Sequence, residues 1–147
     1  MNRAPKTVDD ILQVKGREVW TVTPNDTVYE ALQLMAAKGI GAVVVLNGDR
    51  LVGVMSERDY ARKVILVGKA SRETTVREIM TDKVIAVLPG ASVDECMAIM
   101  TQRRIRHLPV VDQGRLVGMI SIGDVIKAII ADQQFVVEHD RTMWEYA

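Results

Sequence analysis

The chain has 147 residues, enough for one ordinary domain or for two small ones that share a core. Lys and Arg number 19, and Asp and Glu also number 19, so the formal net charge is zero. Such a chain lacks the basic excess of a general nucleic-acid binder or a polybasic membrane anchor. The longest uncharged apolar run, residues 40–46, is shorter than the roughly 20 residues of a spanning helix. A single Cys and N-terminal residues without a signal-peptide pattern lead us to expect a cytoplasmic protein.

A short strand and a capped helix are the first clear elements along the chain. Residues 19–23 are rich in β-branched side chains and end at Pro24, which is typical of a short strand. Thr27 and Glu30 have the spacing of a capping box, in which the hydroxyl and the carboxylate each bind a free backbone N–H group. Apolar residues then recur at helical spacing, so this segment predicts an amphipathic helix.

A hairpin and a second helix are predicted next. Residues 42–46 form an apolar run that predicts a strand, and Asn47-Gly48 is a strong hairpin signal. This dipeptide tolerates positive φ at both turn positions. Residues 51–56 then provide the second strand of the hairpin, and a second helix follows.

The same elements recur 65 positions later in the chain. Residues 19–60 align with residues 84–125 without a gap, and 14 of these 42 pairs are identical, where chance predicts about two or three. A further match, at a shift of 68, relates residues 8–12 to residues 76–80. The unit β-α-β-β-α therefore occurs twice, and two copies can bury their sheets against each other as a pseudo-two-fold pair. The repeat could serve folding alone, but a pseudo-dyad also creates paired clefts between the halves.

The duplicated signature resembles a CBS-domain pair, the Bateman module. The resemblance is carried by residues 105–111 and 118–124 in the second copy and by residues 53–59 in the first. It implies an α/β fold of the α+β kind, in which tandem β-α-β-β-α CBS motifs pack as a pseudo-two-fold pair. It also implies a non-catalytic regulatory module, usually dimeric, that binds adenine nucleotides in up to two clefts and signals by conformational change.

The resemblance divides the chain into three parts. We expect CBS motif 1 over residues 8–67, CBS motif 2 over residues 76–131, and a C-terminal helical tail over residues 132–147. Residues 126–147 have no counterpart in the first copy, and three of the six Phe, Trp and Tyr residues lie there. Their apolar spacing suggests a long helix, which could cover the module's own end or form a dimer contact.

Two Ser-x-x-Asp motifs, Ser56 with Asp59 and Ser121 with Asp124, occupy equivalent positions in the two copies. Each could be a helix cap, because a hydroxyl and an acid three residues later bind free backbone N–H groups. Each aspartate could instead bind a ribose, since a carboxylate offers two oxygens to a cis-diol. The residues alone leave both interpretations open, and the family resemblance favours ribose binding.

Residues 103–107 contain three arginines and a histidine. Such a run often forms a solvated patch, but this one enters a predicted buried strand and can project toward the same cleft as Ser121. Arginine binds phosphate with paired hydrogen bonds, and a neighbouring phosphate would favour a protonated histidine. The resemblance places phosphate contacts here, at Arg104, Arg106 and His107.

The first copy departs from this pattern, with Gly39, Gly41 and Ala42 in place of the cations. We expect Arg58 to supply charge there, so the clefts should differ chemically, which allows unequal occupancy and two different adenine ligands. The candidate walls for the base are Thr21, Val22, Ile40, Ile85, Val87 and Leu108. The full predicted nucleotide-binding set is Thr21, Ile40, Gly41, Ser56, Arg58, Asp59, Ile85, Arg104, Arg106, His107, Leu108, Pro109, Ser121 and Asp124.

The implied ligand is AMP, ADP, ATP, or NAD(H) bound through its adenylate half, with no catalytic cofactor. Two His and one Cys cannot form a standard closed zinc site, so no metal site is predicted. A homodimer and an unknown effector protein are the expected protein partners. The competing hypotheses are a ligand-independent dimeric scaffold and an enzyme, although the sequence shows no nucleophile-base-acid set.

Overall fold

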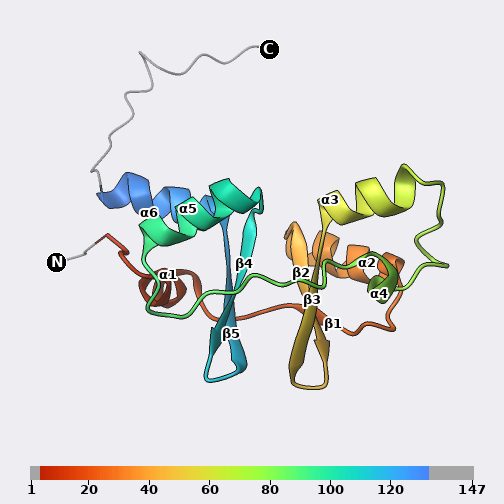
Figure 1. Ribbon diagram of the computed structural model, residues 1–147, viewed down its shortest axis with the longest axis horizontal. Coiled ribbons are helices and arrows are strands. Elements are labelled where there is room, and N and C mark those ends of the chain that lie inside the picture. Colours follow the sequence, from red (N-terminus) through yellow and green to blue (C-terminus); the bar gives the residue numbers. More distant parts are fainter. Residues whose placement is uncertain (1–3, 133–147) are drawn as a thin grey trace, which may run out of the picture.

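The computed structural model describes residues 4–132, in which two similar halves lie side by side (Figure 1). The first half contains β1 (Thr21–Val22), α2 (Val28–Lys38), β2 (Ala42–Asn47), β3 (Arg50–Ser56), α3 (Glu57–Tyr60) and the π-helical turn η1 (Ala61–Ile65). The second half contains α5 (Val93–Arg103), β4 (His107–Asp112), β5 (Arg115–Ser121) and α6 (Ile122–Asp132). Two further helices, α1 (Val8–Lys15) and α4 (Val76–Ile79), precede the respective copies in the chain.

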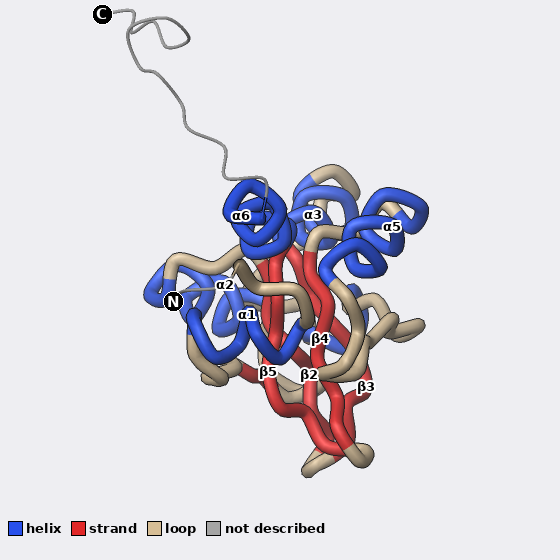
Figure 2. The backbone as a smooth tube through the Cα atoms, turned by 90° about the vertical axis from the view of Figure 1, so that its left-hand side faces the viewer, coloured by secondary structure: helices blue, strands red, loops and turns tan. Residues whose placement is uncertain are grey.

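The strands form one sheet in each half. In the first half β1 runs parallel to β2, and β2 runs antiparallel to β3. In the second half β4 and β5 form an antiparallel pair. Figure 2 shows the strands of the two hairpins side by side, with α3, α5 and α6 at one end of them. This arrangement confirms the predicted mixed α+β fold of paired motifs.

The predicted first strand of each copy is shorter in the structure than in the sequence analysis. The first is reduced to Thr21–Val22, and the second to a single parallel bridge between Val87 and Val110. The residues next to each shortened strand line a cavity between the halves: residues 19–20 in the first copy and residues 83–85 in the second.

The turn of the first hairpin lies one residue later in the chain than the sequence predicts. Asn47 pairs with Arg50 as part of the ladder, so the loop of the first hairpin is Gly48-Asp49. Gly48 has φ +64°, whereas Asn47 has extended backbone, and the expectation of positive φ at both residues of Asn47-Gly48 is wrong. The equivalent loop of the second hairpin, Gln113-Gly114, has positive φ at both positions.

Each half completes its core with the helix that precedes the other copy. Leu12 of α1 belongs to the core of the second half, and Ile79 of α4 belongs to the core of the first half. Reciprocal backbone bonds fix this exchange: the Val8 N–H donates to the Ala91 carbonyl at 2.9 Å, and the Val76 N–H donates to the Asp26 carbonyl at 2.8 Å. Each half therefore contributes one helix to the core of the other half.

A glycine on the second strand of each hairpin admits the exchanged helix. A Cβ placed on Gly118 would lie 2.7 Å from Cδ2 of Leu12, and one placed on Gly53 would lie 2.5 Å from Sδ of Met80. Both distances are shorter than van der Waals contact, so any larger residue would force the neighbouring side chain to move. The identical glycines of the repeat are thus explained by close approach.

The predicted C-terminal tail, residues 132–147, lies outside the described residues from residue 133 onward. Helix α6 ends at Asp132 and carries Val125 and Ala128 into the core. Within residues 4–132, the helices are too short or too polar to cross a lipid bilayer.

Candidate functional site

Two cavities, each of about 780 Å³, lie along the boundary between the halves. The first cleft lies between the β3–α3 junction, residues 83–85, residues 104–107 and Pro109. The second cleft lies between residues 15–20, the loop 39–42 and the end of β5. Many residues that line the first cleft therefore have repeat partners that line the second, as expected for two copies related by a pseudo-two-fold axis.

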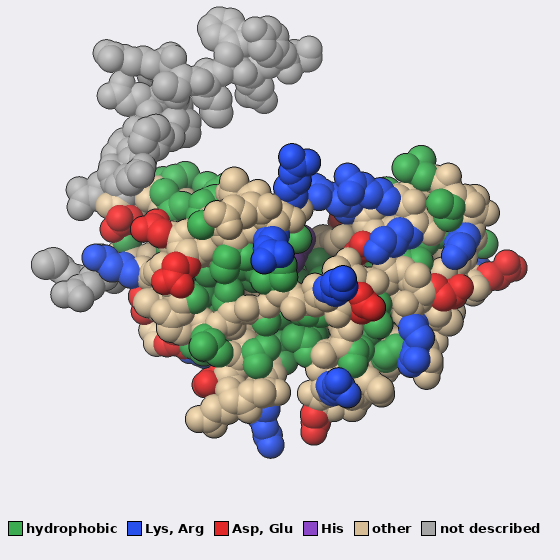
Figure 3. All heavy atoms as spheres, in the orientation of Figure 1, with side chains coloured by type: hydrophobic (Ala, Val, Ile, Leu, Met, Phe, Trp, Pro, Cys, Tyr) green, Lys and Arg blue, Asp and Glu red, His purple; other side chains and the backbone are tan. Residues whose placement is uncertain are grey.

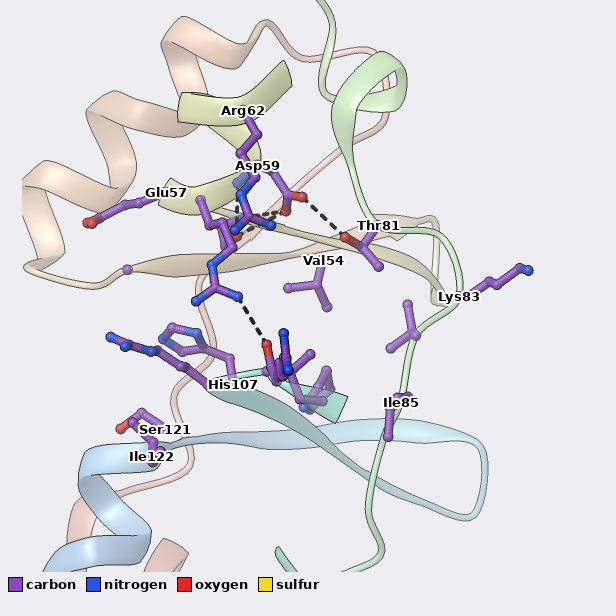
Figure 4. Close-up of a pocket in the computed structure, with 18 of the residues that line it drawn as sticks. Val54, Glu57, Asp59, Arg62, Thr81, Lys83, Ile85, His107, Ser121 and Ile122 are labelled. Atoms are coloured by element: carbon purple, nitrogen blue, oxygen red, sulfur yellow. Dashed lines mark hydrogen bonds between the residues drawn. The ribbon is translucent and has the colours of Figure 1, made fainter. Parts of the chain in front are cut away.

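The carboxylate of Asp59 is a buried acid in the wall of the first cleft (Figure 4). It accepts hydrogen bonds from the N–H of Ser56 at 2.9 Å and from the hydroxyl of Thr81 at 3.3 Å, and it pairs with the ammonium of Lys63 at 3.0 Å. Ser56 in turn accepts from the Asp59 N–H, so the predicted helix cap is present in full. The same carboxylate therefore caps α3 and lines the cleft.

Arginine side chains gather at the same cleft. The guanidinium of Arg58 donates to the carbonyl of Arg104 at 3.1 Å, which links α3 of the first half to the end of α5 in the second. In the space-filling view, Lys and Arg side chains surround the hollow between the halves (Figure 3). The residues responsible are Arg58, Arg62, Lys63, Lys83, Arg104 and Arg106.

Arg104 holds an unusual backbone conformation. It is the C-cap of α5 with φ +54°, whereas the equivalent C-cap of α2 is Gly39 with φ +64°. A side chain in this left-handed region costs roughly 1–2 kcal/mol, a cost that glycine avoids. The chain therefore keeps an arginine at the cleft at a position where backbone geometry favours glycine.

Asp124 is held by a cation near the second cleft. Its carboxylate accepts from the Ser121 N–H at 2.8 Å and pairs at 2.7 Å with the ammonium of Lys15, which also donates to the Met119 carbonyl. Partial burial raises the pKa of Asp124, but the bonds from Lys15 and Ser121 outweigh it, so the pKa lies below its ordinary value. Because Lys15 comes from α1, this pair also fastens the exchanged helix to α6.

His107 lies in the wall of both clefts, next to Gly41. A Cβ on Gly41 would lie 3.5 Å from Cε1 of the imidazole. Burial lowers the pKa of His107, and Lys15 and Arg106 act in the same direction, while Asp124 and Glu57 oppose them. The equivalent residue of the first copy is Ala42, so this imidazole has no twin.

The predicted site residues divide between the two clefts. Ile85 and Pro109 line the first cleft, Ile40 lines the second, and Gly41 and Ser121 line both. The arginines 104 and 106 share their cleft with Ser121, as expected, but the carboxylate beside them is Asp59 of the first copy. We expected Arg58 to serve one cleft and the other two arginines to serve the other. In the structure all three arginines line the first cleft.

Several predicted residues line neither cleft. Leu108, Val22 and Val87 are buried in the cores, and Thr21 is exposed on β1. Asp124 itself is set behind Lys15, which does line the second cleft. Three of the six residues predicted to line the base-binding wall therefore belong to the hydrophobic cores.

Sequence reasoning missed many of the residues that line the clefts, among them Trp20, Thr81 and Lys83. Trp20 is the repeat partner of the predicted Ile85, so the alignment contained the signal. The ammonium of Lys38 lies 4.1 Å from the centroid of the indole ring. Thr81 lies in a linker without a gap-free repeat partner, so no pattern pointed to it.

Comparisons with known proteins give the class. The CBS domain family model matches residues 7–66 and 76–131. Over 138 residues the chain is 40% identical to the CBS domain-containing protein CBSX3, mitochondrial, of Arabidopsis thaliana, and the match covers 87% of this chain and 66% of the relative. The chain thus spans about two thirds of that relative's length.

Two solved structures extend the comparison. A CBS-domain protein from Burkholderia ambifaria is 57% identical with a TM-score of 0.85, over 90% of this chain and 99% of that one. The CBS domain pair of protein MJ0100, in complex with 5′-methylthioadenosine and S-adenosyl-L-methionine, is 27% identical with a TM-score of 0.73, over 84% of this chain and 94% of that one.

The fold and the paired clefts define a module built from two repeated α+β motifs. The chain belongs to the CBS-domain family and carries the domain as a tandem pair. CBS-domain pairs are regulatory modules that commonly bind adenosine-containing ligands.

Proposed function

We propose that this protein is a non-catalytic sensor that binds adenine nucleotides in the clefts between its two motifs and signals by conformational change. The observation that carries the proposal is the first cleft, where the buried Asp59 carboxylate and a group of arginines line one cavity of about 780 Å³. That volume lies within the range of about 300–1,000 Å³ that is typical of small-molecule sites.

The acid and the cations suit different parts of one nucleotide. The carboxylate of Asp59 can accept hydrogen bonds from ribose hydroxyls, and a ligand diol would share it with Thr81 or displace Lys63. Arg58, Arg104 and Arg106 can bind phosphate oxygens through paired hydrogen bonds. Apolar side chains such as Ile85 and Pro109 line the same cavity and provide a surface for the base.

The expected affinity is that of a sensor. AMP has about 23 heavy atoms, which at about −0.3 kcal/mol per atom gives a binding free energy near −7 kcal/mol and a Kd in the micromolar range. ADP, ATP and NAD(H), bound through its adenylate half, share the adenylate group. The adenosyl ligands in the MJ0100 domain pair support an adenosine-containing ligand for this fold.

Signalling would follow from the position of the clefts. A ligand that contacts both halves favours one relative angle of the halves, and a partner protein can bind that state selectively. The proposed module acts as a homodimer in the cytoplasm, and the exposed side chains of Ile126 and Ile130 on α6 offer apolar surface for association.

Thermal unfolding with a series of nucleotides tests the proposal. At a hundredfold excess of ligand over Kd, linkage stabilises the folded state by about 2.7 kcal/mol, which raises the Tm by about 5–11 °C. Adenosine, AMP, ADP, ATP, NAD and S-adenosylmethionine are compared with guanosine monophosphate as the control. A flat response to every compound would contradict the proposal and favour a ligand-independent dimeric scaffold.

A further inference from the structure

We infer that the two clefts select different classes of adenine ligand: the first binds a phosphorylated nucleotide, and the second binds an adenosyl compound without a phosphate chain. The inference rests on the proposed function and assigns a ligand class to each cleft. It follows from the ion pairs, the repeat positions and the aromatic ring that distinguish the clefts.

The cations of the first cleft are available to a ligand. Arg62, Lys83, Arg104 and Arg106 all line it, and none of the four forms a salt bridge within the part of the chain that the structure describes. In the close-up, the Arg62 side chain points toward the cavity, whereas the Lys83 side chain points away from it, on the side opposite His107 (Figure 4). A phosphate chain would meet unpaired cations without breaking an existing pair.

The cations of the second cleft are already engaged. Lys15 pairs with Asp124 at 2.7 Å, and Arg17 pairs with Asp9 at 2.8 Å. The remaining charged group that lines this cleft is the carboxylate of Glu18, which repels an anion. A phosphate would have to break an ion pair here and leave a partly buried acid without its partner.

The repeat shows that this difference is built into equivalent positions. Two cations of the first cleft are replaced in the second cleft by glycine. The equivalent pairs are Arg104 with Gly39 and Arg106 with Gly41. Because Arg104 occupies a left-handed position that suits glycine, the first cleft keeps its charge despite the backbone cost.

The second cleft has an aromatic ring where the first has an aliphatic side chain. Trp20 lines it at the position that Ile85 occupies in the first cleft. Stacking on an indole binds a base without any contribution from phosphate. Together with the paired cations, this ring favours a ligand whose binding energy comes from base and ribose.

Calorimetric titration with two probes, AMP and 5′-methylthioadenosine, tests the assignment. The double variant Arg104→Gly/Arg106→Gly gives the first cleft the residues of the second, and glycine suits the backbone at position 104. We expect the variant to bind AMP at least about tenfold more weakly and 5′-methylthioadenosine within about twofold of the original affinity. Arg103→Ala is the matched control, because this exposed arginine of α5 lines neither cleft, and it should change neither affinity.

Fluorescence of Trp20 reports the second cleft. The chain has two Trp, so Trp144→Phe leaves Trp20 as the single reporter. We expect 5′-methylthioadenosine to change its emission at lower concentration than AMP does. In the full-tryptophan chain, Trp20→Ile should weaken 5′-methylthioadenosine and leave AMP unchanged.

The outcomes separate the two proposals. If neither probe binds the original protein, the proposed function fails. If both bind but the double arginine variant loses affinity for both equally, or if Trp20 responds to the two probes at the same concentration, the proposed function stands and the assignment of ligand classes is overturned.

Discussion

In both halves of the molecule a glycine of the second hairpin strand admits the helix exchanged from the other copy. Gly53 lies against Met80, and Gly118 lies against Leu12, with the same geometry. At the clefts, by contrast, the two copies keep the Ser-x-x-Asp motif but differ in charge: Arg104 aligns with Gly39, and Arg106 with Gly41. The comparison teaches that the two copies share the close approach that packs the exchanged helix, whereas they differ in the charges that they bring to the clefts.

The shared packing can be broken at the exchanged helix. Leu12 is fully buried in the core of the second half, so Leu12→Ala should lower the free energy of unfolding by about 2–5 kcal/mol. Because both halves contribute to each core, we expect one cooperative transition in urea for the variant as for the original chain. Val14→Ala on the same helix, where the side chain is 80% exposed, should change stability by less than about 0.5 kcal/mol. Two separate transitions would show that the halves fold independently.

The clefts can be separated by changing their acids one at a time. Asp59→Asn keeps an oxygen that can cap α3 but removes the charge, and should weaken AMP by about ten- to a hundredfold. Asp124→Asn should weaken 5′-methylthioadenosine and leave AMP unchanged, since this acid holds Lys15, which lines the other cleft. Calorimetry with both probes on both variants checks the pattern. If both variants bind both probes with unchanged affinity, the two acids only cap helices and do not bind a ligand.

Much of the fold follows from the sequence, because the repeat, the caps and the apolar spacing are local signals. The helices after Thr27 and Ser92 begin where the hydroxyl residues predict them. The sequence did not predict that α1 and α4 are exchanged between the cores. The repeat shows that the two segments are equivalent but not which core each one joins. The second copy's first strand shrank to a bridge because its residues line a cleft, a demand that β-propensity does not express.

The sequence predicted several of the residues of the candidate site, but not which acid and which arginine share a cleft. Asp59 and Arg104 were both identified, but chain order suggested that the arginine would serve the acid of its own copy. In the structure the cleft is formed between copies, so Arg104 lies with Asp59, and its carbonyl accepts from Arg58. Such cross-copy pairing depends on how the halves pack, which no single motif encodes.

The helix caps offer a smaller difference between the copies. Thr27 forms a full capping box, in which Glu30 also accepts from the Thr27 N–H, whereas Glu95 accepts from the hydroxyl of Ser92. Thr27→Ala should lower the free energy of unfolding by about 1 kcal/mol, and Ser92→Ala by a similar or smaller amount. Urea unfolding of the two variants measures this ordering. A larger loss in Ser92→Ala than in Thr27→Ala would contradict this ordering.

His107, which lines both clefts, gives the smallest expected effect. Its pKa is lowered by burial, and by Lys15 and Arg106 against the opposing Asp124 and Glu57, so the unfolded chain binds the proton more readily. The free energy of unfolding should therefore fall as the pH drops below 6.5, and His107→Gln should remove this loss.

Phosphate in the first cleft should act on the same imidazole with the opposite sign. A bound phosphate stabilises the charged form, so AMP binding takes up a proton, and affinity should rise as the pH falls from about 8 to about 6. The phosphate of AMP titrates in this range as well, so the informative quantity is the ratio of affinities between the original protein and His107→Gln. NMR of the imidazole protons gives a direct measure, because the chain has only two His and the variant assigns the signal of His107. If AMP leaves that pKa where it was, or adenosine raises it equally, the imidazole does not contact phosphate, and its place between the clefts is structural.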